Sequence, residues 1–116
     1  MAKNYLLEYS EQLATEIELL CRTLKHTSSN TVFQLRKSSS SVYANIREAK
    51  YGQSKADMLS KFEIALKESS ETEGWLQMLY NTQDIDEAAF KKYRNLAGRI
   101  RRMLIASCVT LKEHIK

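Results

Sequence analysis

The stretch "MLSKFEIALKESSETEGWLQML", residues 58–79, decides the fold of this chain. Its apolar and small side chains recur at alternating steps of four and three residues, which places them on one side of an α-helix. The members of this stripe are Met58, Phe62, Ala65, Ser69, Thr72, Leu76 and Leu79. A stripe that runs this far along one helix predicts lengthwise packing against other helices, as in a bundle.

The segments on either side show the same periodicity, and polar stretches interrupt it at three places. Ser54 with Asp57, and Asp84 with Glu87, have the spacing of a helix N-cap. Short connections make neighbouring helices antiparallel. The sequence therefore predicts an all-α fold, an antiparallel up-down-up-down four-helix bundle that forms one domain over residues 1–116. The expected helices span about 3–26, 30–50, 55–80 and 86–115.

The composition of the 116 residues, 43% hydrophobic and 28% charged, is typical of a globular domain. The lack of proline and the presence of only three glycines argue against a loop-rich or all-β fold. No signal-peptide pattern follows Met1, and no apolar run approaches the ~18–20 residues that span a bilayer. Cys21 and Cys108 fall in apolar stripes, which favours buried thiols over a disulfide or metal pair. We therefore expect a cytoplasmic bacterial protein without a membrane partner.

A stripe of small and polar residues lies beside the apolar face of the second expected helix. Ser38, Ser41, Asn45 and Glu48 are three or four residues apart. Solvated helix faces usually carry Lys and Glu rather than serines, whose helix propensity is poor. We therefore favour a half-buried polar seam, in which Asn45 and Glu48 hydrogen-bond to a neighbouring helix, over a solvated face.

Residues 34–79, "QLRKSSSSVYANIREAKYGQSKADMLSKFEIALKESSETEGWLQML", contain three ordered motifs. The motifs are Ser41-Val42-x-Ala44-Asn45-Ile46-x-Glu48-Ala49, then Gln53-Ser54-Lys55-Ala56-Asp57, then Ala65-Leu66-Lys67-Glu68 with Glu71-Thr72-Glu73 and Trp75-Leu76. This stretch resembles the core of a bacterial four-helix bundle family whose founding members are encoded by intervening sequences in large-subunit ribosomal RNA genes. The family includes the accessory variability proteins of diversity-generating retroelements. Ser39, Tyr43 and Gly74 depart from the family pattern.

The resemblance implies a homopentamer, with five bundles around a central channel, and no known catalytic activity. In length and basic charge, the chain is similar to the retroelement accessory proteins. That similarity implies RNA or DNA as one partner and the reverse transcriptase of such an element as another.

A second apolar stripe on the third expected helix indicates a protein–protein surface. Ile64, Trp75 and Met78 lie about a quarter turn from the core stripe, together with Glu68 and Glu71. Trp and Met are enriched at interfaces, whereas the alternative is simply a wide core face. With the resemblance, we favour an oligomer interface that combines this stripe with the polar seam. Its candidate residues are Ser41, Asn45, Glu48, Ile64, Glu71, Trp75 and Met78.

Positive charge is concentrated in the second and fourth expected helices, and residues 88–112 contain no Asp or Glu. We expect the cations of the fourth helix to lie on the half opposite Phe90 and Leu104. The planar guanidinium of Arg suits phosphate, so this pattern favours a nucleic-acid surface over a merely solvated face. The candidate residues are Lys91, Lys92, Arg94, Arg99, Arg101 and Arg102, with Arg36, Lys37, Arg47 and Lys50 of the second helix. Tyr43, Tyr51 and Tyr93 are candidates either for stacking on bases or for ordinary packing.

The residues do not predict an enzyme, a metal site or a cofactor. Neither His26 nor His114 has a Glu three residues before it, as di-iron bundles require. The isolated glycines form no phosphate loop, and the serine run lacks the Gly-x-Ser-x-Gly setting of a nucleophile. The leading hypothesis is a non-enzymatic, oligomeric accessory protein that binds nucleic acid and partners a reverse transcriptase. The alternative is a protein–protein assembly or adaptor module without a nucleic-acid role.

Overall fold

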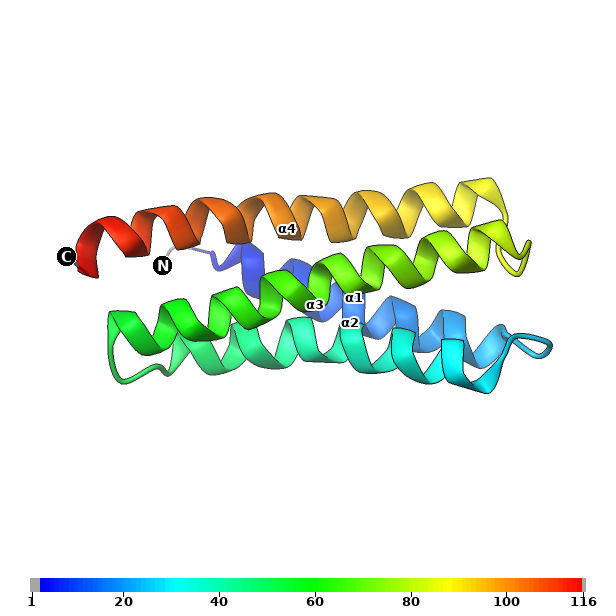
Figure 1. Cartoon of the computed structure of the whole chain (residues 1–116), viewed down its shortest axis with the longest axis horizontal. Coiled ribbons are helices and arrows are strands. Elements are labelled where there is room, and N and C mark those ends of the chain that lie inside the picture. Colours follow the sequence, from blue (N-terminus) through cyan, green and yellow to red (C-terminus); the bar gives the residue numbers. More distant parts are fainter. Residues whose placement is uncertain (1–2, 116) are drawn as a thin grey trace.

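The computed structural model describes residues 3–115 and consists, within them, of four α-helices without any strand. These helices are α1 (Tyr5–Thr23), α2 (Ser29–Lys50), α3 (Lys55–Asn81) and α4 (Glu87–Ile115). Successive helices run in opposite directions along a rod of 48 × 24 × 23 Å (Figure 1). The predicted all-α four-helix bundle is confirmed. Residues 1, 2 and 116, which the domain prediction also included, lie outside the described residues.

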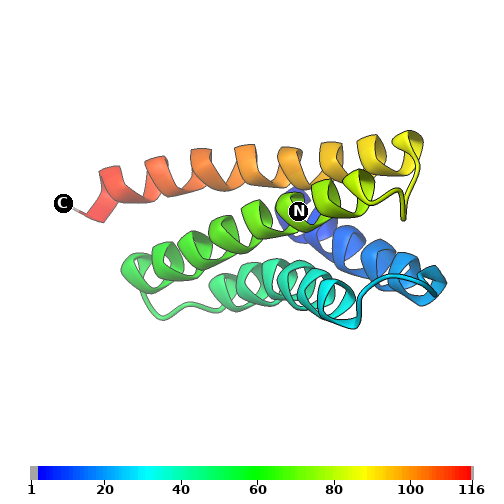
Figure 2. The same cartoon turned by 45° about the vertical axis from the view of Figure 1, so that its right-hand side comes forward.

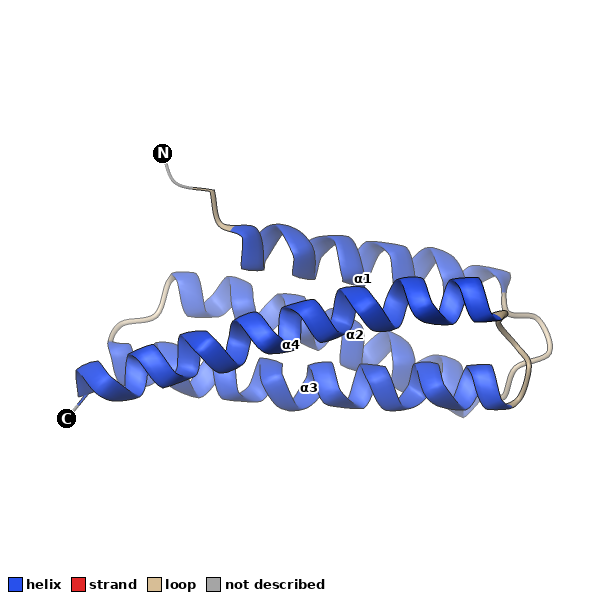
Figure 3. Cartoon of the chain, turned by 90° about the horizontal axis from the view of Figure 1, so that it is seen from above, coloured by secondary structure: helices blue, strands red, loops and turns tan. Residues whose placement is uncertain are grey.

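α1 is shorter than the expected helix over 3–26, because Leu24 already has an extended backbone, with φ −86° and ψ 99°. It contains 19 residues, whereas α4 contains 29. At 1.5 Å per residue, this difference amounts to about 15 Å. The last turns of α4 therefore extend beyond the start of α1, at the end of the rod where the chain begins and ends (Figures 1 and 3).

The N-cap of α3 is the predicted Ser54, whose hydroxyl accepts a 3.0 Å hydrogen bond from the Asp57 N–H. The predicted cap of α4 at Asp84 is wrong. Asp86 caps this helix by accepting a 2.8 Å bond from the Ala89 N–H. The Asp84 N–H still donates to the Leu79 carbonyl, so Asp84 belongs to the turn that ends α3.

The core draws on apolar residues of all four helices and on Ile85 of the connection between α3 and α4. Its fully buried members include Leu13, Ile17, Leu35, Val42, Leu76, Leu79, Ile100 and Leu104. Cys21 and Cys108 are buried and free, as expected. Burial raises the pKa of both thiols because it disfavours the thiolate.

Hydroxyl groups cross the core and link α2, α3 and α4. The Thr72 hydroxyl lies 2.9 Å from the Ser38 hydroxyl, and the Ser69 hydroxyl donates to the Ala97 carbonyl at 3.1 Å. Small side chains at these positions allow the helices to approach closely. Their buried hydroxyl groups find hydrogen-bond partners on the neighbouring helix. Part of the predicted polar seam is therefore buried, at Ser38 and at Ser39 beside it.

The outer part of the predicted seam is arranged differently. Asn45 is half-buried, and its amide donates to the Ser41 carbonyl at 2.9 Å and to the Ser41 hydroxyl at 3.1 Å. The expected bond from Asn45 to a neighbouring helix is thus wrong, since this short side chain reaches the preceding turn of its own helix. Glu48 does connect helices, because it forms a 3.0 Å ion pair with Lys61 of α3.

The helices occupy the corners of a square, in chain order. Each helix packs against the preceding and following ones, and α1 also meets α4, although less extensively than the other neighbours meet (Figure 2). The diagonal pairs make no close backbone contacts within residues 3–115. The edge formed by α1 and α4 is therefore opposite the edge formed by α2 and α3.

Candidate functional site

The fold separates the ten predicted nucleic-acid-binding cations into two groups. Six lie on α4 and four on α2, which are diagonal to each other. The two groups therefore do not form one surface between adjacent helices, and each has to be judged by its own surroundings.

Carboxylates neutralise four of these ten cations. The ion pairs are Arg36–Glu18 at 2.9 Å, Lys91–Glu87 at 2.8 Å, Lys92–Glu16 at 3.1 Å and Arg101–Glu73 at 2.8 Å. The hydrogen bonds from Arg22 and Arg36 lower the pKa of Glu18, and the bond from Lys91 lowers the pKa of Glu87. A lowered pKa favours the ionised form of Glu18 and Glu87, so Arg36 and Lys91 present less charge to a polyanion.

The expectation that Arg101 lies on the outward half of α4 is wrong. It follows Ala97 by four residues and therefore sits beside the core stripe, where it bridges to Glu73 of α3. Arg94 follows Phe90 by the same spacing, and its guanidinium carbon lies 4.9 Å from the centroid of that ring. Both side chains are thus drawn toward the α3 side of α4.

Arg99 and Arg102 are the two candidates that the structure brings together around one hollow. This hollow has a volume of about 600 Å³ and is also lined by Asn95 and Leu96. Both arginines are exposed, and neither has a carboxylate within 4.0 Å among residues 3–115. The Arg99 guanidinium lies over the Tyr9 ring, 4.5 Å from its centroid, which orients it by a cation–π contact.

A second hollow, of about 420 Å³, adjoins the first because Arg99 lines both. Its other lining residues are Met103 of α4 and two tyrosines of α1, Tyr5 and Tyr9. The tyrosine rings are stacked, with centroids 6.0 Å apart and an interplanar angle of 25°. We refer to the two hollows together as the α1–α4 site.

Sequence reasoning missed Tyr5 and Tyr9 and instead considered Tyr43, Tyr51 and Tyr93. The Tyr43 hydroxyl donates to Glu11 at 3.2 Å, so this ring has a structural partner. The available signal was the four-residue spacing of two tyrosines at the start of the first helix. Their position beside Arg99 depends on how α1 packs against α4.

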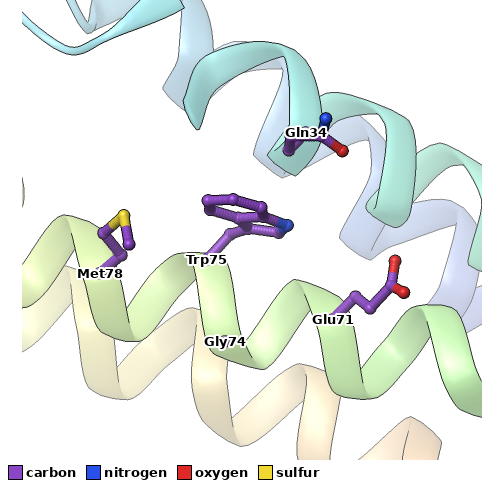
Figure 4. A pocket seen from close by; sticks show the side chains of 5 residues that line it. All are labelled: Gln34, Glu71, Gly74, Trp75 and Met78. Carbon is purple, nitrogen blue, oxygen red and sulfur yellow. The ribbon is translucent and has the colours of Figure 1, made fainter. Parts of the chain in front are cut away.

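The opposite edge of the bundle carries a pocket of about 510 Å³ between α2 and α3. Gln34 of α2 lies above the indole of Trp75, with Met78 and Glu71 on either side along α3 (Figure 4). Trp75 is half-buried against the core, whereas Met78 is 45% exposed. Gly74 also lines this Trp75 pocket, while Ile64 is exposed farther along α3 and does not line it.

The α3 surface next to the Trp75 pocket carries two neighbouring acids, Glu68 and Glu71, and Lys67 and Lys37 also lie near Glu68. Partial burial, and then the neighbouring charge of Glu71, raise the pKa of Glu68. Two like charges three residues apart on a helix repel each other. The Trp75 pocket thus combines an apolar floor with negative charge, in contrast to the cationic α1–α4 site.

The protein is thus an all-α four-helix bundle, with the cationic α1–α4 site on one edge and the Trp75 pocket on the opposite edge. Among residues 3–115, no group of three or more side chains is placed to hold a metal ion. No helix in this range is both long and apolar enough to cross a membrane.

The chain belongs to the 23S rRNA-intervening sequence protein family, whose model matches residues 3–106. A crystal structure of a protein with unknown function from the S23 ribosomal protein family of Bacteroides thetaiotaomicron has the same fold, with a TM-score of 0.86. The two sequences are 34% identical, and the match covers 89% of this chain and 97% of that one. The resemblance inferred from residues 34–79 is confirmed. Among curated proteins, none matches the chain.

Proposed function

We propose that this protein is a non-enzymatic accessory protein that binds the phosphate backbone of nucleic acid through its α1–α4 site. The observation that carries the proposal is the pair of exposed arginines, Arg99 and Arg102, which line one hollow and have no carboxylate within 4.0 Å among residues 3–115. The forked donors of Arg match phosphate oxygens in geometry and charge. Backbone contacts of this kind give binding that depends little on base sequence.

The surroundings of the two arginines support this proposal. The contact with Tyr9 holds Arg99 in place before a ligand arrives, which reduces the entropy lost on binding. The α4 sequence from 88 to 112 has no acidic residue that would repel a phosphate. Lys37, Arg47 and Lys50 lie on α2, which is diagonal to α4, so they do not extend the α1–α4 site.

We further propose that the protein works as a homo-oligomer, a pentamer by the family resemblance, beside the reverse transcriptase of a diversity-generating retroelement. The resemblance of residues 34–79 supports this part of the proposal. Repetition of the α1–α4 site in each copy would raise avidity for a long polyanion without any new contact. An adjacent reverse transcriptase gene and template repeat would support the retroelement role, and their absence would contradict it.

Charge reversal at Arg99→Glu and Arg102→Glu is expected to weaken binding of a structured RNA about tenfold or more at low salt. Affinity of the unaltered protein should fall steeply as salt rises, because counterions are released on binding. Fluorescence anisotropy with a labelled RNA hairpin over a salt series measures both effects.

The control for this experiment is Lys25→Glu with Lys55→Glu, which changes the net charge equally at two exposed positions outside the site. We expect a much smaller loss of affinity for the control. An unaltered protein that fails to retain RNA even at low salt would contradict the proposal. Equal losses in the two double variants would contradict the assignment to the α1–α4 site.

The Trp75 pocket favours a second function, assembly with a protein partner, and we propose that this partner is another copy of the chain. Substitution of Met78 by Glu is expected to shift the protein toward monomers, because a charge would enter an apolar contact. Light scattering after gel filtration measures the molar mass. Val109→Glu on α4, at a similarly exposed apolar position, is the matched control and should leave the assembly intact. A monomeric unaltered protein at high concentration would rule out self-assembly.

A further inference from the structure

We infer that the α1–α4 site takes single-stranded rather than duplex nucleic acid, with an unpaired base on Tyr5 and neighbouring phosphates at Arg99 and Arg102. This inference rests on the proposed function and deepens it by naming the state of the strand. It starts from the fact that one residue, Arg99, lines both a cationic hollow and an aromatic one.

The aromatic hollow has the composition of a base-stacking platform. The Tyr5 side chain is 50% exposed at the edge of the bundle, and its ring stacks on that of Tyr9. Tyr9 is half-buried against the core, and Arg99 lies over its ring. Tyr5 therefore has the Tyr9 ring against it, while much of its own surface stays open. Met103 adds an apolar contact in the same hollow.

A base can use such a platform only when its face is free. In a duplex, the faces of each base are covered by its neighbours in the stack, so duplex nucleic acid can offer this site its phosphates alone. Stacking of an unpaired base on an aromatic side chain stabilises single-strand complexes and tolerates any base, since every base has a π-face. A duplex would therefore leave the aromatic hollow without a stacked base.

The cationic hollow is placed to hold the backbone of the same strand. Arg99 and Arg102 both line this hollow, and Arg99 also lines the aromatic one. A phosphate at Arg99 would therefore lie next to the tyrosines, and Arg102 offers a second cation for another phosphate of the strand.

The experiment compares four probes on the full chain at low salt: oligodeoxythymidylate, oligouridylate, an abasic strand and a duplex, all of one length. The unaltered protein should bind the two base-bearing strands about tenfold more tightly than the abasic strand. The duplex should bind more weakly than the thymidylate strand. Comparison of thymidylate with uridylate distinguishes DNA from RNA as the preferred source of the strand.

Variants then separate stacking from charge. Tyr5→Ala should reduce binding of the base-bearing strands to the level of the abasic strand while leaving the abasic strand unaffected. Tyr5→Phe should retain the preference, because the ring remains. Phe33→Ala, which removes a similarly exposed aromatic ring from α2, should change nothing. Circular dichroism on each variant reports whether the helices are intact.

The outcomes distinguish this inference from the proposed function. Equal affinity for thymidylate, abasic strand and duplex, together with no effect of Tyr5→Ala, would overturn the single-strand inference and leave backbone binding in place. Failure to bind any of the probes would overturn the proposed function itself. Loss of abasic-strand binding in Tyr5→Ala with intact helices would also overturn the inference, because the tyrosine would then serve the phosphate contacts.

Discussion

Replacement of Leu104 by Ala is expected to lower the free energy of unfolding by about 2–5 kcal/mol. Leu104 lies in the middle of α4, and its side chain is 0% exposed among residues of the other helices. Removal of its branched end forfeits transfer free energy and leaves a cavity that rigid, antiparallel helices cannot fully close. In a domain of this size, the melting temperature should fall by on the order of 10–20 °C.

Urea unfolding followed by circular dichroism measures this change. The matched control is Leu19→Ala on α1, where the leucine is 54% exposed. We expect the control to change the free energy of unfolding by about 0.5 kcal/mol or less. Similar losses at the two positions would show that Leu104 does not occupy the core as the structure places it.

Replacement of Ser38 by Leu is expected to destabilise the protein by about 1–3 kcal/mol, although Leu is the better helix former and the more hydrophobic residue. The Ser38 side chain is 1% exposed, and its hydroxyl lies 2.9 Å from that of Thr72 across the α2–α3 interface. A larger side chain would force these two helices apart and remove a partner of the Thr72 hydroxyl. Chemical unfolding measures the loss.

The control is Ser40→Leu, the same change two residues farther along α2 on an exposed face. Helix propensity alone operates there, so we expect a change within about 0.5 kcal/mol. A stabilising effect of Ser38→Leu would contradict the close approach of α2 and α3. Destabilisation at both positions would point instead to a general intolerance of leucine on this helix.

The two surface sites are compatible with one protein because they lie on opposite edges of the bundle. The Trp75 pocket is formed by α3 and α2, whereas Arg99 and the stacked tyrosines belong to α4 and α1. A copy of the chain seated on the Trp75 pocket would leave the α1–α4 site of the same subunit uncovered. The proposed assembly and the proposed nucleic-acid contact can thus occur together and can be tested by separate variants.

The sequence by itself determined the four helices, the family and most of the core, although Met58 and Phe62 of the predicted stripe are only half-buried. Apolar spacing such as that from Met58 to Leu79 reflects the 3.6-residue period of the α-helix, which is a local property of the backbone. The cap at Ser54 is local as well, and it was predicted correctly. Local rules were insufficient at Asp84, because the reversal of the chain between α3 and α4 decides which aspartate reaches the next helix.

Only the tertiary structure decided which of the surface residues act together. Helical geometry alone places Arg99 and Arg101 on opposite sides of α4, but only the packing brings Tyr9 of α1 to the one and Glu73 of α3 to the other. Tyr5 and Arg99 are far apart in the sequence and line the same hollow. The physical reason is that such pairings depend on the rotation and axial offset of one helix against another. Those quantities are set by the packing of all four helices at once, and no single helix encodes them.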